Sequence, residues 1–217
     1  MGKNKVTLGS DDVYCTIAQQ LGVVPDRRVQ VLFYVEGPND IAFFNHISAV
    51  LHQVDPAIPD LTADARIAMV PVGGNTLSQW VNRNYLGNLA LPEIHVYDRD
   101  TAIPPKYQSS VDAVNRRGGT SWATLTSKRE LENYLHPDAI QEALGLTVSF
   151  GDTDDVPKLV ADASRTQAGP HGPLSVDRAK RLLNELATQK MTPARLAARD
   201  PQQEIASWLK RLGSLLE

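Results

Sequence analysis

The chain has 217 residues, of which 42% are hydrophobic and 22% are charged, so it can form one core with a smaller attached unit. Its formal net charge of −3 argues against capture of nucleic acid by the whole surface, although a local basic patch stays compatible with it. The single cysteine, Cys15, excludes a disulfide framework and a thiolate zinc site, and without a membrane-length apolar run or a signal peptide we expect a cytoplasmic protein.

Strands and helices are predicted to alternate over the first part of the chain. In chain order we expect a helix at 11–21 between an N-cap Ser10 and Gly22, a strand at 29–35, a helix at 40–54, a strand at 66–72, a helix at 76–88, a strand at 93–97, a helix at 107–117, a strand at 121–125 and a helix at 127–136. This alternation is typical of an α/β fold with a doubly wound, mostly parallel sheet.

After Pro137 the sequence shows helical periodicity and almost no strand signal. Helices are predicted at 137–146, 156–163, 175–190 and 192–216, with a flexible connector of two Pro and two Gly at 166–173. We therefore expect three parts: a helical lead-in at 1–28, an α/β domain at 29–136 and a helical appendage at 137–217 that packs on it.

Two segments combine an apolar run with carboxylates at its end. Val31 to Val35 is followed by Glu36 and Asp40, and Ile94 to Tyr97 is followed by Asp98 and Asp100. Ligand sites in open α/β sheets lie at the carboxyl ends of the strands. Acids gathered there would repel one another unless a cation joined them, and oxygen ligands of this kind suit Mg²⁺ or Mn²⁺.

The ordered pair of acidic segments resembles the TOPRIM domain of topoisomerases, primases and several nucleases. Glu36 matches the motif glutamate, Gly37 the sharp turn after it, and Asp98 and Asp100 the later Asp-x-Asp. Two further segments, Val70-Pro71-Val72-Gly73-Gly74-Asn75 and Lys128-Arg129-Glu130-Leu131-Glu132-Asn133-Tyr134-Leu135, resemble the nucleases of the OLD (overcoming lysogenization defect) family. The resemblance covers Val29 to Leu135 and implies a TOPRIM catalytic domain that cleaves DNA, as endonuclease or exonuclease, with two Mg²⁺ or Mn²⁺ ions.

The resemblance also implies a partner that the sequence lacks. OLD proteins begin with an ABC-type ATPase, but no Gly-x4-Gly-Lys-Ser/Thr loop occurs here. We expect either the nuclease half of a longer protein, with an upstream ATPase through which it oligomerises, or a free-standing relative.

In the implied two-metal site, Glu36, Asp40, Asp98 and Asp100 supply most ligands and Glu132 completes the second site. Residues two apart on a helix lie about 200° apart, so Glu130 is expected to point elsewhere. Arg178, Lys180, Arg181 and Lys190 are basic candidates for contacting phosphate from the tail, and Lys190 is the one we assign.

Other interpretations stay open at this point. Glu36 and Asp40 could cap a helix, because acids favour helix N-termini. Asp98-Arg99-Asp100-Thr101 is similar to the Asp-x-Asp-x-Thr motif of haloacid dehalogenase-like phosphatases, although the threonine comes one residue early and the motif follows the third strand. A third possibility is a non-catalytic DNA-binding or assembly module.

Overall fold

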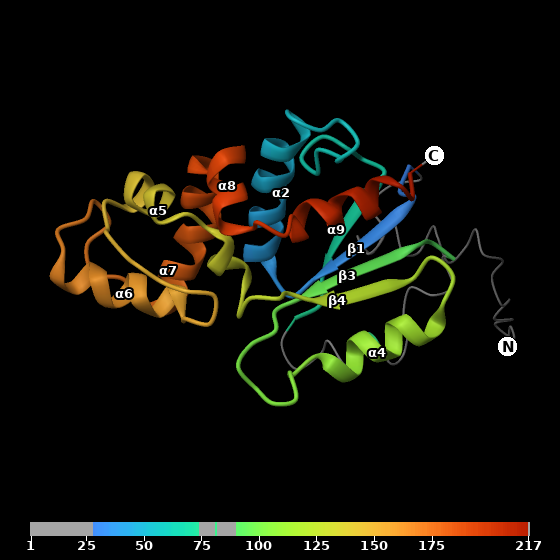
Figure 1. Ribbon diagram of the computed structural model, residues 1–217, viewed down its shortest axis with the longest axis horizontal. Coiled ribbons are helices and arrows are strands. Elements are labelled where there is room, and N and C mark those ends of the chain that lie inside the picture. Colours follow the sequence, from blue (N-terminus) through green and yellow to red (C-terminus); the bar gives the residue numbers. More distant parts are fainter. Residues whose placement is uncertain (1–27, 74–80, 82–89, 217) are drawn as a thin grey trace, which may run out of the picture.

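The computed structural model describes residues 28–73, 81 and 90–216 (Figure 1). The predicted helix at 11–21 with Cys15, and nearly all of the one at 76–88 with Trp80, lie outside the described residues. Four strands, β1 (Val31–Val35), β2 (Ile67–Pro71), β3 (Glu93–Tyr97) and β4 (Trp122–Leu125), form one parallel sheet in the order β2-β1-β3-β4. The predicted α/β class with a parallel sheet is confirmed.

Helices cover both faces of this sheet, as the doubly wound prediction requires. α2 (Pro38–His52) and α9 (Glu204–Gly213) lie on one face and α4 (Gln108–Arg117) lies on the other (Figure 1). All five residues of the inner strand β1 are buried: Val31, Phe33 and Val35 join the core under α2, whereas Leu32 and Tyr34 join the core under α4. Successive side chains point to opposite faces, so a strand buried on both sides is apolar throughout.

The chain after β4 is helical, as predicted, but the helices predicted at 137–146, 175–190 and 192–216 are shorter or divided, whereas the one predicted at 156–163 extends to Thr166. α5 (Pro137–Leu144) and α6 (Val156–Thr166) come first, and α7 (Val176–Leu182) continues into a π-helical turn (Leu183–Ala187) and a 3₁₀ turn (Thr188–Lys190). α8 (Pro193–Arg199) ends at Asp200, whose carboxylate accepts hydrogen bonds from the first backbone N–H groups of α9. No helix within the described ranges has the length and apolar character that a membrane crossing requires.

One apolar core joins the sheet to these helices. It runs from β1 and α2 through α5, α6 and α7 to α8 and α9, and Phe44 of α2 contacts Trp208 of α9 with ring centroids 6.4 Å apart. The division of the chain at residues 136 and 137 stays a prediction.

The predicted helix at 127–136 is wrong. Only Leu131–Tyr134 is helical, as a 3₁₀ turn, and Glu130 before it is extended, with φ −151° and ψ 170°. Backbone groups that an α-helix would pair internally bond elsewhere: the N–H of Leu131, which would donate to the carbonyl of Ser127 in that helix, donates to Oδ1 of Asp98 at 3.0 Å. Pro137 also disfavours the helical conformation at His136.

Candidate metal centre

Three buried carboxylates meet at the carboxyl edge of the sheet. Asp98 follows β3, and Glu130 and Glu132 lie in the segment after the neighbouring strand β4. Each offers an oxygen, and these oxygens all lie within 4.8 Å of one another. These residues are 6%, 8% and 0% exposed, respectively. The adjacent parallel strands β3 and β4 end at one edge and thus bring distant parts of the chain together.

A lysine from the C-terminal helices faces this acidic cluster. Nζ of Lys180, on α7, lies 3.3 Å from Oε2 of Glu130, 3.5 Å from Oε2 of Glu132 and 3.7 Å from Oδ2 of Asp98. Burial opposes the charged ammonium, but Glu132, Asp98 and Glu130 together raise the pKa of Lys180 above its ordinary value. Lys180 is therefore the internal counter-charge of the cluster.

Lys190, the lysine assigned from the sequence, lies in a different setting. It is exposed at the end of the 3₁₀ turn, and its backbone carbonyl accepts a hydrogen bond from Nη1 of Arg195 at 2.7 Å. Its catalytic role stays a prediction, and Lys180 is the basic candidate of the tail that the fold brings to the carboxylates.

Glu36 and Asp40 lie beside the cluster, between the end of β1 and the start of α2. Oε1 of Glu36 accepts a hydrogen bond from the backbone N–H of Asp98 at 2.6 Å, and Oδ2 of Asp40 accepts one from Gly37 at 2.9 Å. Burial and the nearby Asp40 raise the pKa of Glu36 to about 7. Burial and Glu132 raise the pKa of Asp40 to about 6. The fold thus gathers these two acids with Asp98 and Glu132.

Gly73, which follows the second strand, packs tightly against the backbone of Glu36. A Cβ atom at this position would lie 1.8 Å from the backbone carbonyl oxygen of Glu36, so only glycine permits this approach. The close contact fixes the backbone of Glu36 against the chain that leaves β2, and Gly73 is therefore a packing requirement of the acidic edge.

Asp100 does not continue the extended strand that the sequence argument assumed. Its φ is +57°, in the left-handed region, and its backbone N–H donates to the carbonyl of Arg129 at 2.9 Å. The alternation that would have aimed Asp98 and Asp100 the same way is therefore broken. Asp100 still contributes, after burial and Asp40, to the raised pKa of Glu36, so its charge acts on this edge of the sheet.

The expectation that Glu130 points away from the site is wrong. It rested on an α-helix, whereas the extended Glu130 and the 3₁₀ turn after it aim both glutamates into one cluster. Burial and the charge of Glu132 raise the pKa of Glu130 to about 7. The sequence signal for this turn is Asn133, whose Oδ1 accepts from the N–H of Glu130 at 3.1 Å, together with the proline that follows at 137.

The cluster fits a hard cation. Oε1 of Glu130 is a buried side-chain atom without a hydrogen-bond partner, and buried Oε2 of Glu132 has only the ion pair with Nζ of Lys180 at 3.5 Å. Buried acceptors are normally paired, because desolvation without a partner costs free energy. Carboxylate oxygens within 4.8 Å of one another are the donor set that Mg²⁺ or Mn²⁺ takes. The described structure therefore contains one candidate cation site at Asp98, Glu130 and Glu132.

Asn184 holds Glu132 from the π-helical turn, a contact that the sequence did not indicate. Its Nδ2 donates to Oε1 of Glu132 at 2.5 Å and to the carbonyl of Lys180 at 2.8 Å. Both partners are acceptors, so the amide nitrogen has to face them. The backbone carbonyl of Asn184 accepts from Thr188, whose Oγ1 lies 2.7 Å from Nδ1 of His46 on α2. Single π turns inside helices are frequent at functional sites.

We predict that Asn184→Leu weakens metal binding. Leucine keeps the volume but leaves Oε1 of Glu132 without its donor, and hydrogen bonds to charged groups contribute about 1.5–3 kcal/mol. The Mn²⁺ concentration that gives half of the maximal thermal stabilisation should rise on the order of tenfold. Asn45→Leu is the matched control, because Oδ1 of Asn45 on α2, like Oδ1 of Asn184, has no hydrogen-bond partner, and the two residues differ in the contact that Nδ2 of Asn184 makes with Glu132. Equal metal midpoints for the two variants would contradict the role of Asn184.

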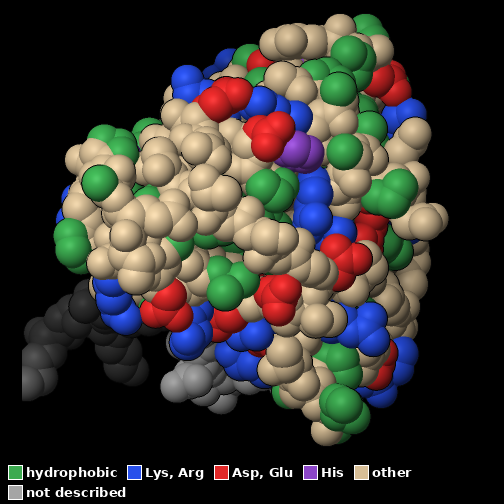
Figure 2. Space-filling view, turned by 60° about the vertical axis from the view of Figure 1, so that its left-hand side comes forward, with side chains coloured by type: hydrophobic (Ala, Val, Ile, Leu, Met, Phe, Trp, Pro, Cys, Tyr) green, Lys and Arg blue, Asp and Glu red, His purple; other side chains and the backbone are tan. Residues whose placement is uncertain are grey.

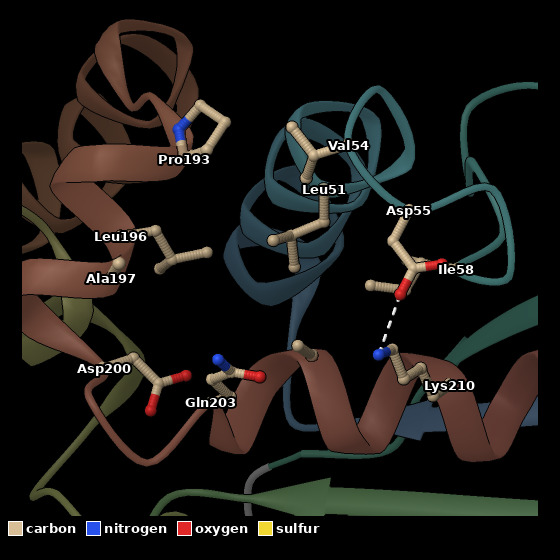
Figure 3. A pocket seen from close by; sticks show the side chains of 11 residues that line it. Leu51, Val54, Asp55, Ile58, Pro193, Leu196, Ala197, Asp200, Gln203 and Lys210 are labelled. Carbon is tan, nitrogen blue, oxygen red and sulfur yellow. Dashed lines mark ion pairs between the residues drawn. The ribbon is translucent and has the colours of Figure 1, made fainter.

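A separate pocket of about 230 Å³ opens between the C-terminal end of α2 and helices α8 and α9 (Figure 3). Leu51, Ile58 and Leu196 line its apolar wall, and an ion pair of 2.8 Å joins Asp55 and Lys210 at its side. Leu51 lies about 16 Å along the axis of α2 from Asp40. The pocket is therefore remote from the acidic cluster and takes no part in its chemistry.

Comparison with known proteins adds no relative to this picture. No protein-family model matches the chain, and neither does any curated protein or any solved structure. The functional argument therefore depends on the site itself and on the sequence resemblance.

Proposed function

We propose that this protein is a metal-dependent nuclease that hydrolyses DNA phosphodiesters in the manner of the TOPRIM domains of OLD-family nucleases. The observation that carries the proposal is the buried cluster of Asp98, Glu130 and Glu132 at the carboxyl edge of a parallel sheet, with Lys180 against it. The order of the acidic segments in the sequence, Glu36 with Asp40 and then Asp98 with Asp100, supports the same proposal.

The residues divide into metal ligands and a phosphate contact. Asp98, Glu130 and Glu132 would hold one cation, and Glu36, Asp40 and Asp100 would supply the ligands of a second. A bound divalent cation supplies a nucleophile by lowering the pKa of water and offsets charge on the departing oxygen. Lys180 would neutralise charge that develops on the phosphate, and the position of its Nζ, 3.3 Å from Oε2 of Glu130 and 3.7 Å from Oδ2 of Asp98, supports this role.

The phosphatase alternative needs a free nucleophilic oxygen on Asp98. In the structure Oδ1 of Asp98 accepts the N–H of Leu131 at 3.0 Å, and Oδ2 lies 3.7 Å from Nζ of Lys180. That mechanism also leaves Glu36 and Asp40 without a role. The grouping of an Asp98 oxygen within 4.8 Å of oxygens of Glu130 and Glu132 therefore supports metal binding over covalent catalysis.

The charge pattern of the surface bears on how DNA would bind. On the face shown in Figure 2, Lys and Arg side chains are interspersed with Asp and Glu side chains and do not form one continuous basic patch. Phosphate contacts would therefore be local, which agrees with the net charge of −3. An ABC-type ATPase domain, as in OLD proteins, is the partner that we propose to supply further DNA contacts.

The proposal predicts metal-dependent cleavage. Purified protein should nick or degrade plasmid DNA with Mg²⁺ or Mn²⁺, and EDTA should stop the reaction. It should also hydrolyse bis(p-nitrophenyl) phosphate, a diester, faster than p-nitrophenyl phosphate, a monoester. Full cleavage in EDTA would exclude the mechanism, preference for the monoester would favour a phosphatase, and metal-independent DNA binding without cleavage would favour a binding module.

A further inference from the structure

The loop between β3 and α4 presents a large apolar side chain to solvent. Ile103 is 98% exposed, more than the other large hydrophobic side chains that the described ranges expose, Val54 at 61% and Val176 at 42%. Scattered apolar residues on a surface need no explanation, but an isoleucine that touches almost nothing contributes no packing energy to its own fold. Its position relative to the acidic cluster indicates a contact with something outside the chain.

Both ends of this loop are fixed at the acidic edge. At one end Asp98 belongs to the cluster, and the N–H of Asp100 donates to the carbonyl of Arg129 at 2.9 Å. At the other end Tyr107 is buried, with its ring centroid 5.5 Å from that of Tyr97. The loop therefore leaves from the site and returns to it, and its tip cannot move far from the carboxylates.

The tip is short and stiff. Ile103 follows Asp100 by three residues, which span at most about 11 Å when fully extended. Pro104 and Pro105 follow directly, and their rings fix φ near one value, which lowers the freedom of the tip. Exposed Arg99 and Lys106 flank it, so an apolar tip stands between two cations.

We propose that Ile103 is a wedge that inserts between neighbouring bases of duplex DNA beside the phosphodiester to be cleaved, with Arg99 and Lys106 contacting the flanking phosphates. The proposal rests on the proposed nuclease function. Ile103 follows Asp98 of the cluster by five residues, which span at most about 18 Å when extended. Successive bases rise about 3.4 Å along each strand, so the wedge lies within about five base steps of the site. Apolar wedges of this kind unstack base steps and kink the duplex.

A wedge at Ile103 should affect the cleavage of duplex DNA more than the cleavage of single-stranded DNA. Unstacking one base step costs free energy, and the apolar contact of the wedge offsets this cost. Single-stranded DNA is already largely unstacked and has little need of it. Loss of Ile103 should therefore slow the cleavage of duplex DNA and spare the cleavage of a single strand with the same sequence.

The test compares Ile103→Ser with wild-type protein on duplex and single-stranded forms of one oligonucleotide, with Mn²⁺ present. We expect duplex cleavage to fall on the order of tenfold and single-strand cleavage to change by less than about twofold. Ile103→Leu should restore duplex cleavage because it keeps the apolar volume. Val54→Ser is the matched control, since it removes an exposed apolar side chain near the remote pocket and should leave both rates unchanged.

Each other outcome overturns the wedge in a recognisable way. Unchanged rates for Ile103→Ser would show that the tip serves a contact other than DNA, such as a protein partner. Equal losses on both substrates would show a general effect on the site. If wild-type protein cleaves neither substrate, the nuclease proposal itself fails, and that result is distinct from cleavage that ignores Ile103.

Discussion

Replacing Asp98 with asparagine is expected to abolish metal-dependent cleavage while raising the melting temperature of the metal-free protein. Asparagine retains an acceptor for the N–H of Leu131 but removes one charge from the cation site, so we expect a loss of about a thousandfold in rate. Burial raises the pKa of Asp98 well above its usual range even though Lys180 opposes this, so its ionised form destabilises the metal-free fold. Relief of about 1 kcal/mol corresponds to about 2–4 °C.

The two readouts separate a functional site from a structural one. Cleavage is followed on plasmid DNA, and melting temperature is measured at pH 8 in EDTA and in Mn²⁺. Asp112→Asn is the control, because Asp112 is exposed on α4, where its carboxylate accepts from Gln108. Cleavage by Asp98→Asn at the wild-type rate would remove Asp98 from the site, and a lower melting temperature in EDTA would show that Asp98 stabilises the fold.

The sequence specified those features that depend on local pattern. The buried strand 93–97 has the predicted bounds, because burial on both faces leaves a continuous run that ends at the first acid, Asp98. Glu36 and Asp98 could be placed at one edge from the same logic, since parallel strands end together. The 3₁₀ turn at Leu131–Tyr134 was not predicted, because the spacing of the side chains in this segment is typical of an α-helix. That spacing gives no sign that Glu130 is extended.

The remaining parts of the site arise from tertiary packing, which periodicity does not encode. Lys180 and Lys190 fall in one predicted helix, and nothing in their spacing tells which of them meets the sheet. The structure places a π-helical turn between them, at Leu183–Ala187, and Asn184 in that turn contacts Glu132. That contact spans 52 positions in the chain, so no local motif could indicate it.

Replacing Lys180 with methionine is expected to destabilise the metal-free protein at neutral and alkaline pH. Methionine keeps most of the apolar stem but leaves Asp98, Glu130 and Glu132 without their counter-charge. Removing one partner of a buried ion pair costs about 3–5 kcal/mol, and because the Lys180 side chain is 29% exposed we expect the lower value, about 3 kcal/mol, at pH 8.

The loss should depend on pH with a definite sign. Glu36 and Glu130 have folded-state pKa values of about 7, above their ordinary value of 4.5. At these two sites the folded protein binds more protons than the unfolded chain, so their contribution to stability is greatest below about pH 4.5 and is lost as pH rises through about 7. The ammonium of Lys180 stays charged in the folded and unfolded states over this window, so its own titration adds no pH dependence. It stabilises the ionised carboxylates, and this contribution is lost as they gain protons toward pH 5. In Lys180→Met the carboxylates lack that ammonium and gain protons more readily. The loss of folding stability between pH 5 and pH 8 should therefore be larger than in the wild type.

Urea unfolding of wild-type protein, Lys180→Met and Lys190→Met at pH 5 and pH 8 tests this directly. Lys190 is exposed, so its variant should follow the wild type at both pH values, whereas Lys180→Met should approach the wild type only at pH 5. Mn²⁺ should stabilise Lys180→Met more than the wild type at pH 8, because the cation then replaces the missing positive charge. If the two variants lose equal stability, or if Mn²⁺ leaves Lys180→Met unchanged, the carboxylates do not form a cation site that Lys180 balances.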